Sequence, residues 1–131
     1  MTGIFGKIAS GEIASYKIAE DEHFFAFLDL NPLVKGHTLV IPKKEIDYIF
    51  DMDDSLYAEF QLFAKHIANA IQKAIPCKKI GVAVIGLEVP HAHIHLVPLN
   101  KMDDINFSRP KIKLSDMELQ QTADIIKSFL D

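Results

Sequence analysis

The sequence is poor in cysteine, in tryptophan and in positive charge. Cys77 is the single cysteine among 131 residues, which excludes an intrachain disulfide and a C-x-x-C metal site. Lysine and arginine number 14 against 18 aspartate and glutamate residues, so the net charge is −4. A protein that binds nucleic-acid backbones needs a basic face. The charge balance therefore argues against nucleic-acid partners, but not against one small anionic ligand in a local pocket.

Long apolar runs and targeting signals are also lacking. No stretch approaches the roughly 20 apolar residues of a membrane span. The N-terminus has no basic region followed by an apolar run, unlike a secretory signal. We expect a single domain over residues 1–131 that is cytoplasmic and has no membrane partner.

Short apolar runs separated by turn residues predict a β-rich first third and two later strands. The expected strands cover residues 16–20, 23–30, 37–41, 81–85 and 91–99. A tight turn over 86–90 would join the last two, which favours antiparallel pairing.

Apolar residues spaced three and four apart predict two helices. The first begins after Asp53 or Asp54, runs for about 20 residues and ends at Pro76. The second covers residues 116–130 and starts with a capping box from Ser115 to Glu118. Residues 101–113 between strand and helix are polar and are expected to be irregular. This order of elements favours an α+β fold with helices on an antiparallel sheet.

Histidine is the unusual feature, because three of the six histidines alternate at His91, His93 and His95. In a strand, alternate side chains share one face, so three imidazoles would line one side while apolar residues line the other. A neutral imidazole can act as a nucleophile, and a protonated neighbour can hold an anion or donate a proton. The pattern suits phosphoryl or nucleotidyl transfer without a metal or other cofactor.

A zinc site is the competing interpretation of the same histidines. Three imidazole ligands with one open position are typical of catalytic zinc. The histidine face of this strand carries no acidic residue, although Glu88 and Asp29 could approach it in the fold. We favour the metal-free alternative.

Three further segments precede the histidine block at 90–98, and they cover residues 4–13, 26–32 and 36–44. Together and in this order, the four segments resemble the histidine triad (HIT) superfamily and its HINT-like branch, the histidine triad nucleotide-binding proteins. The resemblance spans core motifs from 4 to 98. It implies a HIT-like fold with a five-stranded antiparallel sheet, to which the helix predictions add a long central helix and a C-terminal helix. It also implies a homodimer whose sheets join.

The resemblance further implies a reaction on a purine nucleoside monophosphate derivative. His93 would attack the α-phosphorus to form a nucleotidyl-histidine intermediate, which water then hydrolyses. His91 and His95 would flank the phosphate, and His37 would support them. Asp29 would accept hydrogen bonds from the ribose hydroxyls. The apolar residues implied to line the base pocket, which could otherwise be ordinary core, are Ile4, Phe5, Ile8, Phe27 and Leu30.

The sequence departs from the branch at several positions. Gly3 and Gly6 stand where some relatives carry a zinc-binding cysteine pair, so we expect no structural metal. Glu88 occupies the place of a serine or threonine, and a carboxylate there would repel a phosphate unless it pointed away. The extension over 101–131, with its helix at 116–130, has no tryptophan.

Three functional classes therefore stay open. The first, which the N-terminal segment favours, is a hydrolase of purine nucleoside 5′-phosphoramidates or related adenylates. The second is a dinucleoside polyphosphate hydrolase, and the third is a nucleotide-binding or interaction protein without enzymatic activity. His23 and His66 match none of the motifs and are expected at the surface.

Overall fold

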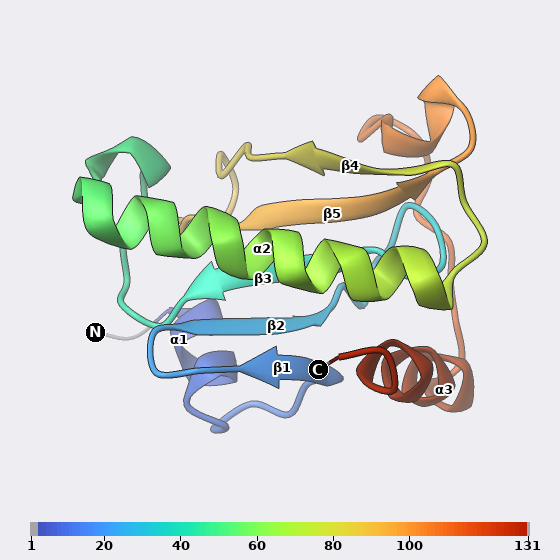
Figure 1. Cartoon of the computed structure of the whole chain (residues 1–131), viewed down its shortest axis with the longest axis horizontal. Helices are drawn as coiled ribbons and strands as arrows, with labels where there is room; N and C mark the ends of the chain where they lie inside the picture. The colour runs from blue at the N-terminus through green and yellow to red at the C-terminus, as the bar shows by residue number, and fades with distance from the viewer. Residues whose placement is uncertain (1–2, 131) are drawn as a thin grey trace.

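The computed structural model describes residues 3–130 and contains one five-stranded antiparallel sheet. The strand order is β1-β2-β3-β5-β4, so β1 and β4 form the edges (Figure 1). The strands are β1 (Lys17–Glu20), β2 (Phe24–Leu28), β3 (Thr38–Pro42), β4 (Lys79–Ala83) and β5 (Ile94–Leu99). The helices are α1 (Ile4–Ala9), α2 (Asp54–Ala74) and α3 (Asp116–Lys127), with 3-10 turns at Ile49–Asp51 and Met102–Ile105. The predicted α+β class with a five-stranded antiparallel sheet is confirmed.

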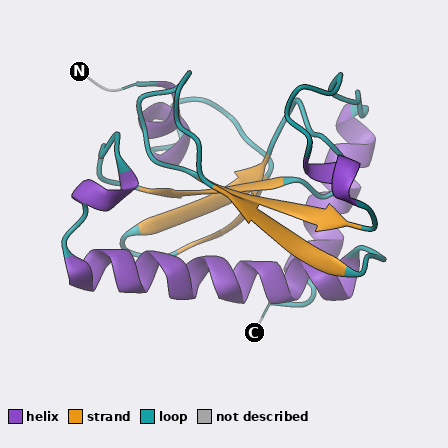
Figure 2. Cartoon of the chain, turned by 90° about the horizontal axis from the view of Figure 1, so that it is seen from above, coloured by secondary structure: helices purple, strands orange, loops and turns teal. Residues whose placement is uncertain are grey.

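Helix α2 runs along the length of one face of the sheet (Figure 2). Its first turn is capped by the Asp53 carboxylate, which accepts a hydrogen bond from the Leu56 N–H at 2.8 Å. Phe60, Ile67 and Ile71 are fully buried at spacings of seven and four, as the periodicity predicts. The helix therefore has the length, the cap and the buried face expected from the sequence.

Helix α3 covers the same face beside α2 and β1 (Figure 1). The predicted capping box is present, because Ser115 Oγ accepts from the Glu118 N–H at 3.1 Å and the Glu118 carboxylate accepts from the Ser115 N–H at 3.0 Å. The helix ends at Lys127, three residues before the predicted end at 130. There the N–H groups of Phe129 and Leu130 bond three residues back, so the chain tightens into a turn.

Strand β5 begins at Ile94, so the prediction of a strand over the whole histidine block is wrong. The Ala92 N–H bonds to the Ile46 carbonyl instead of joining the sheet, since β3 ends at Pro42 and its pairing with β5 reaches only to Ile94. The predicted tight turn is also wrong, because β4 ends at Ala83 and residues 84–93 form a long loop. The antiparallel pairing of β4 with β5 is confirmed.

Helix α1 differs from the prediction of a β-rich first third, in which the first expected element is a strand at residues 16–20. It has six residues, and Phe5 and Ile8 face inward against β2 and β3 on the side of the sheet opposite α2. A pair spaced by three is too short a pattern to predict a helix from sequence. Strand β2 is also shorter than expected, ending at Leu28 rather than at residue 30.

Within residues 3–130, no helix is long and apolar enough to cross a bilayer. The extent of the domain over 1–131 stays a prediction.

Candidate active site

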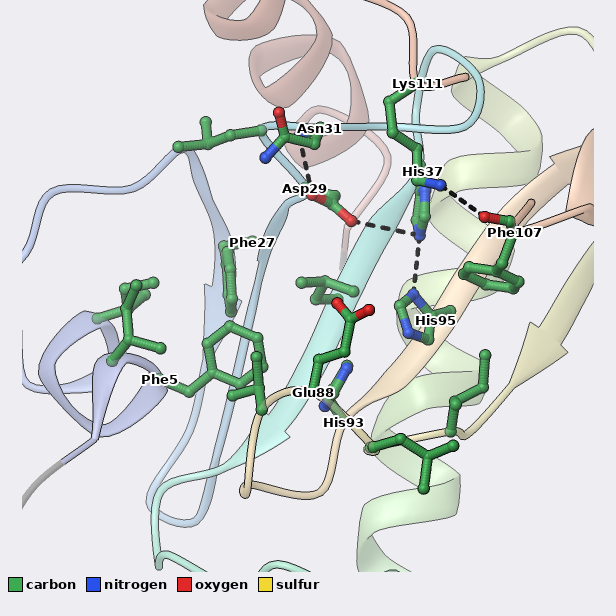
Figure 3. A pocket seen from close by; sticks show the side chains of 18 residues that line it. Phe5, Phe27, Asp29, Asn31, His37, Glu88, His93, His95, Phe107 and Lys111 are labelled. Carbon is green, nitrogen blue, oxygen red and sulfur yellow. Dashed lines mark hydrogen bonds and ion pairs between the residues drawn. The ribbon is translucent and has the colours of Figure 1, made fainter. Parts of the chain in front are cut away.

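A cavity of about 500 Å³ lies on the sheet face that α2 does not cover (Figure 3). Its walls come from α1, the ends of β2 and β3, the loop over 84–93 and the chain after β5. Nine of the ten residues predicted for the site line it: Ile4, Phe5, Ile8, Phe27, Asp29, Leu30, His37, His93 and His95. The tenth, His91, is not among the lining residues. His23 and His66 are exposed, as predicted.

His91 lies behind the cavity rather than in it, with only 2% of its surface exposed. Its Nε2–H donates to the Pro42 carbonyl at 2.8 Å, so its Nδ1 carries a lone pair when the ring is neutral. Nδ1 is buried and has no hydrogen-bond partner among residues 3–130. The shared histidine face inferred from strand alternation therefore does not include His91, because this residue precedes β5 and is held against the end of β3.

The tautomer of His93 follows from its backbone partner. Its Nδ1 lies 2.7 Å from the His91 carbonyl, which can only accept, so Nδ1 must carry the proton. The neutral ring then presents a lone pair at Nε2. Phe5 packs edge-on against this ring at 5.0 Å between centroids and helps to orient it. Burial is the main cause that lowers the pKa of His93 below 6.5, which favours the unprotonated ring at neutral pH.

His37 and His95 form a hydrogen-bonded pair, in which a backbone N–H determines the proton position of His37 and His37 determines that of His95. The Leu33 N–H donates to His37 Nδ1 at 3.0 Å, so the proton of the neutral ring sits on Nε2. That Nε2 lies 3.0 Å from His95 Nδ1, which must therefore accept. His95 consequently carries its proton on Nε2 and can donate a hydrogen bond.

Both rings are neutral at pH 7. Burial lowers the pKa of His37 to about 3, with smaller contributions from His95, Lys111 and His93. Burial, His93 and Lys111 lower the pKa of His95 to about 4. The tautomers assigned to these rings therefore hold over the physiological range.

Asp29 lies at the end of β2, where it adjoins the histidine pair. One carboxylate oxygen accepts from the Asn31 N–H at 2.9 Å, and the other lies 3.7 Å from His37 Nε2. Burial raises the pKa of Asp29 above its usual value. The second oxygen faces the cavity side of the histidine pair and can accept hydrogen bonds from a ligand (Figure 3).

Asp29, His37 and His95 are close enough to suggest a metal site, with candidate ligand atoms within 4.8 Å of one another. The proton positions do not fit this. Because His37 Nδ1 accepts from Leu33, its Nε2 carries a proton and has no lone pair for a cation. Binding a metal would require this proton to leave a ring whose other nitrogen faces an N–H donor. The geometry therefore favours the metal-free interpretation of the histidines.

Phe107 and Lys111 line the cavity from the segment that was expected only to be irregular. The Phe107 ring packs edge-on against His95, with centroids 4.8 Å apart. Lys111 Nζ donates to the Phe107 carbonyl at 2.9 Å (Figure 3). Arg109 ties the segment to the chain before His37 by donating to the Leu33 carbonyl at 2.7 Å. An isolated aromatic residue in a polar run was the only sequence signal for this wall.

Comparison with known proteins agrees with this architecture. Residues 10–102 match the HIT domain family. An uncharacterised HIT-like protein from Borreliella burgdorferi is 39% identical over 113 residues, which cover 81% of each chain. An adenosine 5′-monophosphoramidase from Saccharomyces cerevisiae is 34% identical over 96 residues, or 72% of this chain and 61% of that one.

A solved structure shares the fold over nearly the whole chain. A Hit-like protein involved in cell-cycle regulation from Bartonella henselae superposes with a TM-score of 0.84 at 29% identity, over 98% of this chain and 97% of that one. The family match spans well over half of the sequence and includes the histidine block, and the fold agrees with it. The protein therefore belongs to the HIT domain family.

Proposed function

We propose that the protein is a nucleotide hydrolase that cleaves purine nucleoside 5′-phosphoramidates or related adenylates through a nucleotidyl-His93 intermediate. The observation that carries the proposal is the bond from His93 Nδ1–H to the His91 carbonyl, which leaves the Nε2 lone pair available in the cavity. The relative from Saccharomyces cerevisiae, whose name is adenosine 5′-monophosphoramidase, supports the substrate class.

The reaction takes place in two displacements at phosphorus. His93 Nε2 attacks the α-phosphorus, and the bond to the leaving group breaks with its electron pair on the departing atom. A leaving amine takes one proton from solvent. Water then attacks the same phosphorus, returns the electron pair to Nε2, releases a proton and frees the nucleoside monophosphate.

The other residues of the site bind and position the substrate. His95 Nε2–H donates to a phosphate oxygen, and Lys111 adds positive charge on the same side. His37 positions His95 by donating to its Nδ1. His91 acts through its carbonyl, which holds the tautomer of His93, rather than by flanking the phosphate as the resemblance implies. Asp29 accepts from the ribose hydroxyls.

The purine base lies against an apolar wall made by α1 and the strand beside it. Phe5 and Ile8 are buried from solvent on this wall, while Ile4 and Leu30 are exposed at its rim. Phe27 packs edge-on against Phe5 at 5.7 Å and completes the surface. An apolar wall next to a carboxylate suits a nucleoside, because the wall can contact the base while the carboxylate contacts the sugar.

Substitution of His93 tests the proposal. We expect His93→Ala to reduce hydrolysis of adenosine 5′-phosphoramidate by at least about 1,000-fold while AMP binding by calorimetry persists. His66→Ala, an exposed histidine on α2, is the matched control and should keep full activity. A panel with diadenosine polyphosphates separates the two enzymatic classes. Full activity of His93→Ala would remove the nucleophile assignment, and binding without turnover by wild type would favour the non-enzymatic class.

We further propose a homodimer that forms through β4. This strand is a sheet edge, and its residue Val82 is 59% exposed. An exposed apolar edge strand is a site for pairing with another chain. Val82→Arg should convert a dimer to a monomer in sedimentation velocity, and a wild-type monomer would contradict the proposal.

A further inference from the structure

Glu88 is the feature of the cavity that the proposed reaction does not use. It belongs to the loop over 84–93, it is exposed, and it lines the cavity. Figure 3 shows its carboxylate turned into the cavity on the side of His93 and His95. Among residues 3–130 it has no hydrogen-bond or ion-pair partner. A negative charge without a partner therefore faces the position where phosphorus chemistry would occur.

The arrangement of charges assigns a side of the cavity to each part of a substrate. The apolar wall of α1 and the carboxylate of Asp29 serve the nucleoside. Lys111 and the histidine pair are available to the phosphate oxygens, and Lys111 is close enough to influence the pKa values of His37 and His95. The leaving group is the remaining substituent on phosphorus, and it would lie next to the loop that carries Glu88.

A carboxylate in this position discriminates between leaving groups by charge. It repels sulfate, phosphate or a carboxylate, and it attracts an ammonium group through a charge-assisted hydrogen bond. We propose that Glu88 is a specificity-determining residue that selects leaving groups with a positive charge and rejects anionic ones. This inference rests on the proposed hydrolase function and narrows its substrates to nucleotides linked to cationic amines.

A suitable probe is adenosine 5′-phosphoramidate whose nitrogen carries a 2-aminoethyl group. His93 Nε2 forms a bond to phosphorus while the P–N bond breaks, and its electron pair stays on the nitrogen. That nitrogen takes a proton from solvent and leaves as ethylenediamine, whose far ammonium pairs with Glu88. Water then releases AMP from His93 and loses one proton to solvent.

The test compares this probe with two analogues of similar size. The N-propyl analogue replaces the ammonium by a methyl group, and the N-carboxymethyl analogue carries a carboxylate in place of the terminal aminomethyl group. We expect wild type to prefer the aminoethyl over the propyl compound by about fivefold in kcat/KM and to prefer propyl over carboxymethyl. Glu88→Gln, which keeps the size of the side chain, should bring all three values to within about twofold of one another.

A second carboxylate controls for the loss of one negative charge from the protein. Glu59 is exposed on α2, on the opposite face of the sheet, and Glu59→Gln should keep the wild-type order of preference. Hydrolysis of all three compounds by wild type without preference, or an unchanged preference in Glu88→Gln, would overturn the role of Glu88 and leave the hydrolase intact. Hydrolysis of none of the three by wild type would overturn the proposed function and this inference with it.

Discussion

One face of the sheet is covered by α2 and α3, and there nineteen buried residues form a single apolar cluster. On the other face, within residues 3–130, only six buried apolar residues cluster, beside the histidines and the cavity. The same strands serve both faces, since Ile94 and Leu96 point into the larger cluster while His95 between them lines the cavity. The difference indicates that the helix-covered face supplies most of the hydrophobic stability, which allows the other face to bury polar rings at a cost.

The largest expected effect is a loss of folding stability at acid pH, and it tests whether the face with the histidines is responsible for this loss. The pKa of His37 is about 3 in the folded chain, below 6.5, so the unfolded chain binds more protons between these values. The contribution to stability is complete above pH 6.5 and is lost as pH falls toward 3, by about 5 kcal/mol for this ring alone. Urea denaturation at neutral pH and at about pH 4.5 should show about 3 kcal/mol of this loss, because pH 4.5 lies between the two pKa values.

Two variants locate the acid sensitivity. His37→Asn should lower stability at neutral pH, but it should lose about 3 kcal/mol less than wild type on acidification to about pH 4.5. His66→Asn, on the exposed side of α2, should follow wild type. An unchanged acid response in His37→Asn would mean that the two faces do not differ in this way.

The next largest effect is a loss of stability on truncating a side chain in the helix-covered face. Phe60 on α2 is fully buried and stacks on Phe24 with ring centroids 5.4 Å apart. Phe60→Ala should reduce the free energy of unfolding by about 4 kcal/mol, because it leaves a cavity in the larger cluster. The kcat/KM of the folded fraction should stay within about twofold of wild type. A large loss of kcat/KM in fully folded protein would show that the two faces are coupled.

The smallest expected effect on stability comes from Phe107→Ala, which should reduce activity more than stability, in contrast to Phe60→Ala. Phe107 packs on His95 from the half-buried cavity wall, so Phe107→Ala should cost about 1 kcal/mol of stability. The variant should also have a kcat about tenfold lower, with little change in KM. Without Phe107, His95 would no longer place its N–H correctly against the phosphate in the transition state. Phe129→Ala, an exposed aromatic after α3, is the control. A change in KM alone would assign Phe107 to substrate binding rather than to positioning.

Much of the helix-covered face could be predicted from local patterns. The cap at Asp53 and the capping box at Ser115 depend on residues three apart, and the buried stripe of α2 depends on a repeat of three and four. These interactions lie within one helical turn, so the order of residues is enough to specify them.

The cavity face could be predicted only in part. The motifs identified nine of its lining residues, but Phe107 and Lys111 come from a segment with no periodic pattern. The conformation of the histidine block was also mispredicted, because Ala92 bonds to Ile46 and holds the chain out of the sheet. Alternation along a sequence implies a shared face only where the chain pairs as a strand.

The sequence by itself determined the class of fold, the two long helices and the presence of several imidazoles near an acidic group. Only the tertiary structure decided what each imidazole can do. The position of the ring proton on His91 is determined by Pro42, 49 residues away in the sequence, and that on His95 by His37, 58 residues away. A carbonyl can only accept and an N–H can only donate, so these distant contacts determine which nitrogen of each ring keeps a lone pair.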